Sequence, residues 1–336
     1  MMTEEVTALL VRWRRALLAL VLAVLLVVGV VVLIGKAAGY AKLLDHIGDA
    51  EKGWLAVCAL GVVVAYVGYA QLLRSVVRIE HGPDLGLGLS ARVVFGSLGA
   101  TQLLATAGAG GIGVTYWAMR RSGFSRSEAI TRTIGFNTLL WLVLGGTAWI
   151  AALLTTLHVG GTAPAGVAFP WLVLIPFCIL AARYVTAPQR VERLERTDGG
   201  WLRRAFGLGV TATAFVRRAS CTRVLAEAGG YWLGNAGCLW AGLRAFGVHL
   251  SLPQLVLAFA TGYVATVLPL PLSGAGGFDA AMTYAVHALG VPLAPALLGV
   301  IVYRLFTFWL LTIPGGINLL LLPRTGKELE RLAAHA

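Results

Sequence analysis

The stretch Ile130–Leu157, ITRTIGFNTLLWLVLGGTAWIAALLTTL, carries one charged residue, Arg132, in 28 positions. A helix needs about 20 predominantly apolar residues to cross the ~30 Å hydrocarbon core of a bilayer. The whole chain has the same character, since hydrophobic residues make up 58% of its 336 positions and charged residues only 12%. Its mean hydropathy is +0.81. We therefore expect an all-α integral membrane protein.

Five more apolar runs reach or approach spanning length, which gives about six spanning helices in total. They are Ala16–Ile34, Trp54–Leu73, Phe169–Tyr184, Val224–Val248 and Ala294–Leu322. The first of them is longer than the roughly 7 to 15 apolar residues of a secretory signal peptide. It is therefore expected to be retained as a span.

Arginine and lysine residues indicate the orientation of these spans. Of the 27 Lys and Arg residues, 22 fall in five segments that the predicted topology puts on one side: 12–15, 74–92, 120–132, 183–223 and 324–331. The positive-inside rule places that side, with both chain termini, in the cytoplasm of a multi-pass plasma-membrane protein. Because the basic residues lie between apolar runs and do not form one patch with interleaved aromatics, nucleic acid is not an expected partner.

Two apolar segments do not fit simple crossings. Val93–Ala107 would cover only ~22 Å as a helix and is followed by Gly108-Ala109-Gly110-Gly111. Since both flanks of the unit 93–121 are basic, we expect a re-entrant helical hairpin that enters and leaves from the cytoplasm. A second unit, 253–289, contains Pro269–Gly277 and by the same parity enters from outside.

The two hairpins also match each other in sequence. Gly108-Ala-Gly-Gly corresponds to Gly274-Ala-Gly-Gly, and an ungapped register puts Asn137 opposite Arg304. The flanking spans run in opposite directions, so the hairpins form a candidate inverted repeat. The chain is then one membrane domain with a first repeat (54–157), a basic cytoplasmic connector (185–223), a second repeat (224–322) and a cytoplasmic tail (323–336). The connector is either an amphipathic segment on the inner leaflet or a plain loop.

The glycine turns are the first candidate binding elements. A helix that starts just after such a turn directs backbone N–H groups at an anion, and breaks at membrane depth are tolerated where they line a wet cavity. This makes candidate substrate-binding residues of Gly110, Gly111, Ser273, Gly276 and Gly277. The alternative is that each motif is only a tight connection between packed helices.

Ionisable residues within spans are the second set of candidates, because an Arg or Asp at the bilayer centre costs about 2.5 to 3.5 kcal/mol on insertion scales. Arg304, beside Tyr303, lies ten residues into the last run and should face the protein interior or water. Asp279 follows the second glycine turn by two residues. Its alternatives are an ordinary acid at a helix start or an ion pair with Arg304.

Polar residues on two other spans complete the set. Glu227, Tyr231 and Asn235 recur at four-residue spacing and so share one helix face, although Arg223 one turn earlier could form a boundary ion pair with Glu227. Asn137 lies deep in its span and needs a hydrogen-bond partner. Each of Glu227, Asn235 and Asn137 is a candidate substrate-binding residue.

Several chemistries are not expected. The four cysteines show no CxxC or Cys/His spacing, and the six histidines are isolated, so neither a metal site nor a catalytic nucleophile is indicated. The chain has no P-loop, which argues against an ATP-driven pump contained in it. We expect no cofactor and no enzymatic activity.

Several of these motifs resemble one family in particular. They are Gly108-Ala-Gly-Gly with Tyr116-Trp-Ala-Met-Arg-Arg-Ser-Gly-Phe-Ser, Leu268-Pro-Leu-Pro through Gly276-Gly-Phe-Asp279, Gly290-Val-Pro, and Tyr303-Arg304 before Phe308-Trp309. Over about Trp54–Leu322 the sequence resembles the flippase-like transmembrane family that includes the membrane half of lysylphosphatidylglycerol synthases. Where the family often has Pro before its first glycine turn, this chain has Ala105-Thr106-Ala107.

The resemblance implies movement of a modified phospholipid between leaflets. The soluble domain that makes the aminoacyl ester in fused synthases is expected to be absent, because the sequence ends soon after the last span. We expect a lipid flippase whose partners are membrane lipids, with aminoacyl lipids, glycolipids and polyprenyl phosphates all open as substrates. One alternative is a non-transporting scaffold for a lipid-modifying transferase. A membrane transferase with Asp279 or Glu227 as base is a third.

Overall fold

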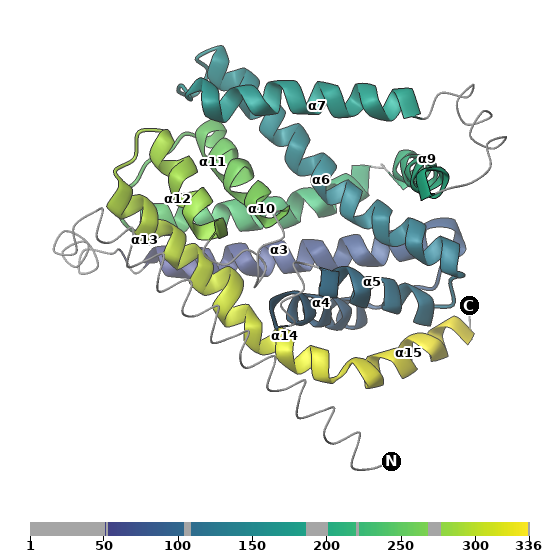
Figure 1. Cartoon of the computed structure of the whole chain (residues 1–336). Coiled ribbons are helices and arrows are strands. Elements are labelled where there is room, and N and C mark those ends of the chain that lie inside the picture. Colours follow the sequence, from purple (N-terminus) through teal and green to yellow (C-terminus); the bar gives the residue numbers. More distant parts are fainter. Residues whose placement is uncertain are drawn as a thin grey trace.

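The computed structural model describes residues 51, 53–103, 109–185, 201–219, 222–267 and 277–334. Within them the chain is helical and has no strand (Figure 1). The helices are α3 (Gly53–Arg78), η1 (Ile79–His81), α4 (Leu87–Leu103), α5 (Ala109–Arg121), α6 (Arg126–Thr156), α7 (Ala165–Val185), α9 (Trp201–Ala219), α10 (Thr222–Arg244), α11 (Leu252–Val264), η2 (Ala265–Val267), α12 (Gly277–Ala288), α13 (Leu293–Arg304), η4 (Leu305–Trp309), α14 (Leu310–Leu320) and α15 (Leu322–Ala334). The predicted span Ala16–Ile34 lies outside the described residues, as do Ser273 and Gly276.

Four of the described helical segments are long and apolar enough to cross a membrane. They are Gly53–Arg78, Arg126–Thr156, Ala165–Tyr184 and Leu293–Leu320. Each corresponds to a run predicted from the sequence. The fourth joins α13 and α14 through the π-helical turn η4.

The run Val224–Val248 forms the single helix α10, of 23 residues, but it is not among the four apolar segments. Its interior includes Glu227, Tyr231 and Asn235 together with several glycines, which lower its hydropathy. Part of this polar face packs inside the protein, since Asn235 is buried and only 11% of the Glu227 side chain is exposed.

Helices α3 and α10 pack against each other along the centre of the molecule (Figure 1). Glycines on both helices let the backbones approach closely, because a Cβ added at Gly234 would lie 2.3 Å from the Gly61 carbonyl oxygen. One added at Gly68 would lie 2.8 Å from the Glu227 carbonyl oxygen. Small residues at such crossings are a common way to pack helices in a bilayer, where lipid tails are as apolar as leucine.

Two helix pairs occupy the positions of the predicted hairpins. In the first, α4 packs on α5, and the Ser97 hydroxyl on α4 donates to the Gly111 carbonyl oxygen at 2.9 Å. In the second, α11 packs on α12, where a Cβ at Gly262 would lie 2.6 Å from the Met282 sulfur. Figure 1 shows the two pairs toward opposite ends of the α3–α10 pair.

One end of the molecule gathers ion pairs, and we call it the basic end. Here Arg78 ends α3, Arg121 ends α5 and Arg126 begins α6. The Arg74 guanidinium donates to Asp84 at 2.8 Å and lowers the pKa of that carboxyl group.

At the basic end, the buried Arg132 on α6 helps to terminate α3. Its guanidinium donates to the carbonyl oxygens of Val76 at 2.8 Å and Ile79 at 2.7 Å. The same group lies 4.1 Å from the centre of the Phe124 ring. Arg132 is therefore more than a topology signal, because it satisfies the last carbonyl groups of a neighbouring helix.

The tail 323–336 contains the amphipathic helix α15, which packs against the first hairpin. Glu328 lies 2.8 Å from Arg92 of α4, and Glu330 pairs with Arg121 of α5. Between them Leu329 is fully buried. The helix thus contacts both arms of the hairpin.

Candidate functional site

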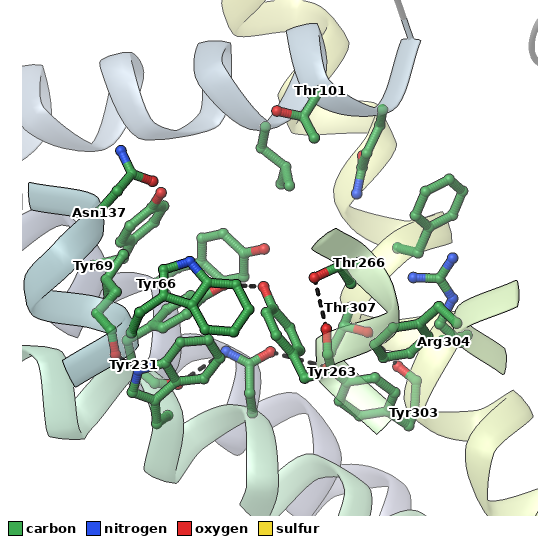
Figure 2. Close-up of a pocket in the computed structure, with 18 of the residues that line it drawn as sticks. Tyr66, Tyr69, Thr101, Asn137, Tyr231, Tyr263, Thr266, Tyr303, Arg304 and Thr307 are labelled. Carbon is green, nitrogen blue, oxygen red and sulfur yellow. Dashed lines mark hydrogen bonds between the residues drawn. The ribbon is translucent and has the colours of Figure 1, made fainter. Parts of the chain in front are cut away.

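A chamber of about 360 Å³ lies where the two hairpins approach the α3–α10 pair. Its walls come from α3, α4, α5, α6, α10, α11, η2, α12, α13 and η4. Aromatic rings and hydroxyl groups line it, with the five tyrosines Tyr66, Tyr69, Tyr231, Tyr263 and Tyr303 contributing most (Figure 2). Such a lining offers hydrogen bonds to a polar group at a depth where lipid offers none.

Arg304 is the cation of this chamber. Its side chain is only 11% exposed, and its Nε lies 2.8 Å from Oδ1 of Asp279. The guanidinium carbon contacts two aromatic rings, 4.8 Å from the centre of Phe278 and 4.3 Å from that of Phe308. Its Nη2 is buried and has no hydrogen-bond partner among the described residues.

This arrangement leaves Nη2 of the guanidinium without a hydrogen-bond partner among the described residues. Asp279 lies at the Nε edge, and the rings of Phe278 and Phe308 lie close to the guanidinium carbon. A guanidinium carries five N–H donors in a rigid fork that fits carboxylate or phosphate. An anion that entered the chamber would therefore meet the remaining edge of Arg304.

Local chain geometry sets this position. α12 begins at Gly277, so Asp279 lies in its first turn, where the helix dipole favours a carboxylate. On the other side, the π-helical turn η4 starts directly after Arg304. Single π-helical turns are frequent at functional sites, because they shift the side chains of one turn against the rest of the helix.

Asn235 and three tyrosines form one connected group in the wall of the chamber. The Tyr303 hydroxyl lies 3.5 Å from Asn235 Oδ1, and the Asn235 amide donates to the Tyr231 carbonyl oxygen at 2.9 Å. The Tyr231 hydroxyl in turn lies 3.5 Å from that of Tyr263. These hydroxyl contacts are long, so the groups can turn toward a ligand at little cost.

Asn137 lies across the chamber from Arg304 (Figure 2). Its amide nitrogen donates to the Thr133 carbonyl oxygen at 2.9 Å, which supplies the partner that its depth requires. Its Oδ1 remains available to the chamber that it lines. Polar groups therefore face each other across the site.

The family described as the lysylphosphatidylglycerol synthase TM region matches residues 17–315 of this chain. The chain belongs to this family. The match confirms the resemblance seen in the motifs, and it concerns the membrane domain of these synthases, which is their non-catalytic part. No curated protein matches the chain.

Membership of the lysylphosphatidylglycerol synthase TM family places the protein in a membrane and in the context of lipid modification or translocation. Among the residues that the structure describes, no group of three or more His, Cys, Asp or Glu could hold a metal ion. The chamber of this family member is lined by polar and aromatic side chains.

The structure brings together only part of the set predicted from sequence. Arg304, Tyr303, Asn137 and Asn235 line the chamber, and Asp279 reaches it through Arg304. Glu227 does not line it. Its carboxylate accepts from Ser75 at 2.9 Å and from Arg223 at 3.0 Å, which is the boundary ion pair given above as the alternative.

Of the candidate glycines that the structure describes, Gly111 has a packing role. Gly111 is buried between α4 and α5, where a Cβ would lie 2.1 Å from the Thr101 hydroxyl oxygen. Neither Gly110 nor Gly277 lines the chamber, although Gly277 begins the helix that carries Asp279.

Sequence reasoning missed the aromatic wall. Tyr66 and Tyr69 on α3, Tyr263 on α11 and Trp141 on α6 all line the chamber. One signal was present, because tyrosine hydroxyls in the middle of an apolar run need partners inside the protein. Tyr66 and Tyr69 are also three residues apart and so share a helix face.

Proposed function

We propose that this protein moves a phospholipid between the leaflets of the plasma membrane, with the lipid phosphate bound at Arg304. The observation that carries the proposal is the Arg304 guanidinium in a polar chamber of a membrane protein, where Asp279 meets its Nε and its Nη2 has no partner among the described residues. Burial of a cation at this depth is costly unless an anion compensates it, and Asp279 meets only one edge. A phosphate held by the other edge would form a charge-assisted pair.

The proposed topology follows the charge pattern. The chain would have six spans, both termini in the cytoplasm, and two re-entrant hairpins related as an inverted repeat. Four apolar helical segments of spanning length and the placement of the hairpins toward opposite ends of α3–α10 support it. Rocking of one repeat against the other would then open the chamber to each leaflet in turn.

In this mechanism the head group sits among the tyrosines while the acyl chains remain in an apolar environment. Tyr303, Asn235 and Asn137 offer donors and acceptors for the polar part of the head group. The aromatic rings keep the site poor in water, which strengthens the attraction between Arg304 and phosphate. No chemical step is required of the protein.

A scaffold for a lipid-modifying enzyme is the second candidate, because the matched family is named for synthases. A scaffold needs no bound lipid at Arg304. Lipid content therefore separates the two functions.

The protein should retain phospholipid through purification. Mass spectrometry of the native complex is expected to find one phospholipid class enriched over the bulk membrane, and Arg304→Gln should lose most of it. Arg244→Gln is a matched control, since Arg244 also contacts two aromatic rings, 5.5 Å from the centres of both Trp54 and Trp240, but does not line the chamber. Lipid in bulk proportions on both the wild type and Arg304→Gln would favour the scaffold.

A further inference from the structure

Two cavities between α5 and α6 form a furrow that runs from the chamber toward the basic end. Their volumes are about 290 and 420 Å³. The furrow is lined by Ile112, Gly113 and Tyr116 of α5 and by Arg126, Ile134 and Thr138 of α6. It is distinct from the site around Arg304 and adjoins it.

The furrow adjoins the chamber, and the two share wall residues. Ile112 lines the chamber and both furrow cavities, and Asn137 and Trp141 line the chamber and the nearer furrow cavity. Thr133 and Ile134 are common to the two furrow cavities. A ligand could therefore pass from one end to the other along α6 without leaving the protein surface.

The dimensions and lining of the furrow fit one acyl chain. From Arg126 to Trp141 it follows 15 residues of α6, or ~22 Å of helix. Its surface is largely apolar, and Ile112 is 52% exposed although it adjoins a polar chamber. The exposed Arg126, at the end of the furrow farther from the chamber, would face lipid phosphates at the membrane surface.

A third cavity, of about 460 Å³, lies between α6, α10 and α11, but a tryptophan separates it from the chamber. Trp232 lines both spaces, and its indole N–H donates to the Leu140 carbonyl oxygen at 2.7 Å. This bond joins α10 to α6, and the Trp232 ring also packs edge-on against Tyr263 at 4.8 Å. Trp232, held by this hydrogen bond and this ring contact, therefore forms a wall between the chamber and the third cavity.

We propose that the furrow is the lateral entrance for phospholipid from the leaflet at the basic end, and that it holds one acyl chain while the phosphate is at Arg304. This inference rests on the proposed lipid transport. It adds the route by which the lipid enters and the leaflet from which it comes. It also makes Trp232 the barrier on the side of the other leaflet.

Photochemical labelling tests the route. Wild-type protein in liposomes would be irradiated with phosphatidylglycerol that carries a diazirine in one acyl chain, and labelled peptides would be identified. We expect label on residues 109–121 and 126–141. Label confined to α10 and α11, on protein that transports lipid, would overturn the entrance but leave the proposed function standing.

A blocking variant tests the same route by rate. Gly113 lines the furrow and a Cβ there meets no atom within 4 Å, so Gly113→Leu should fold and fill the space. It is expected to lower the transport rate about tenfold or more, on the scale of an overpacked contact. Gly146→Leu on α6 is the matched control, because Gly146 also has open space around it and lies outside these cavities.

Ile112→Trp provides a second block in case Gly113→Leu folds poorly, with Leu142→Trp as its control at 48% exposure. Slow transport by the furrow variants and normal transport by the controls supports the entrance. Equal rates in the furrow variants and their controls overturn it. Wild-type protein that moves no lipid would overturn the proposed function, and the entrance with it.

Discussion

Replacing Arg304 with lysine is expected to lower lipid transport at least about tenfold while thermal stability stays close to that of the wild type. Lysine keeps a positive charge beside Asp279 but lacks the planar fork that binds phosphate with two parallel bonds. Transport would be followed in liposomes, and stability by the unfolding temperature of the purified protein in detergent. This variant separates the two roles of Arg304, which alanine does not.

Alanine is expected to have the larger effect, since it removes both roles. Arg304→Ala leaves the carboxylate of Asp279 buried without its cation, and loss of one partner of a buried pair costs about 3 to 5 kcal/mol. We expect near-complete loss of transport together with reduced stability. The double variant Asp279→Asn with Arg304→Gln should recover the stability and remain inactive.

The control for the series is Arg244→Gln, which should transport normally. The ligand role of Arg304 is excluded if Arg304→Lys transports at the wild-type rate. It is also excluded if the double variant recovers transport together with stability, because the pair is then purely structural.

Replacing Gly234 with leucine is expected to destabilise the whole bundle. A Cβ at this position would lie 2.3 Å from the Gly61 carbonyl oxygen and 2.4 Å from the Ala65 nitrogen, and all of these are backbone atoms that cannot turn aside. The helices α3 and α10 must then move apart along their length. We expect a loss of about 3 kcal/mol or more, at the upper end of overpacking effects.

The measurement is the unfolding temperature and the monodisperse yield of Gly234→Leu beside Gly237→Leu. Gly237 lies three residues later on α10, and a Cβ there meets no atom within 4 Å. Leucine also favours a helix over glycine by up to about 1 kcal/mol, so the control should be neutral or stabilised. Equal stability of the two variants would contradict the close α3–α10 packing.

Hydropathy was sufficient to predict most of the helices. Runs such as Ile130–Leu157 and Trp54–Leu73 correspond to α6 and α3 because an apolar run of spanning length has few other stable forms in lipid. The short runs around the glycine motifs correspond to α4, α5, α11 and α12. α10 is the exception, since its hydropathy is lowered by residues that face the interior of the protein.

The site was only partly predictable. Arg304 and Asp279 were visible as charges in apolar runs, and the structure pairs them. Glu227 was predicted on the same ground, but it contacts Ser75 and Arg223 outside the chamber. One face of α10 extends from the chamber to the basic end, so residues on that face have different neighbours. The spacing of residues along one helix does not predict which side chains of other helices they contact.

The tyrosine wall and the turn η4 depend on tertiary packing. Tyr66 and Tyr69 face the chamber because the Gly61 and Gly68 crossings set the rotation of α3 against α10. The π-helical turn after Arg304 has no local sequence signature in the run Leu305–Trp309. Both features emerge only when several helices are in place.

Transport by the purified protein alone tests the central claim most directly. Liposomes containing the wild-type chain, Arg304→Lys or Arg244→Gln would carry a fluorescent phospholipid in one leaflet, and its appearance in the other would be timed by quenching from outside. We expect rapid equilibration with the wild type and Arg244→Gln, and equilibration at least about tenfold slower with Arg304→Lys. Wild-type liposomes that equilibrate no faster than protein-free ones would contradict the central claim.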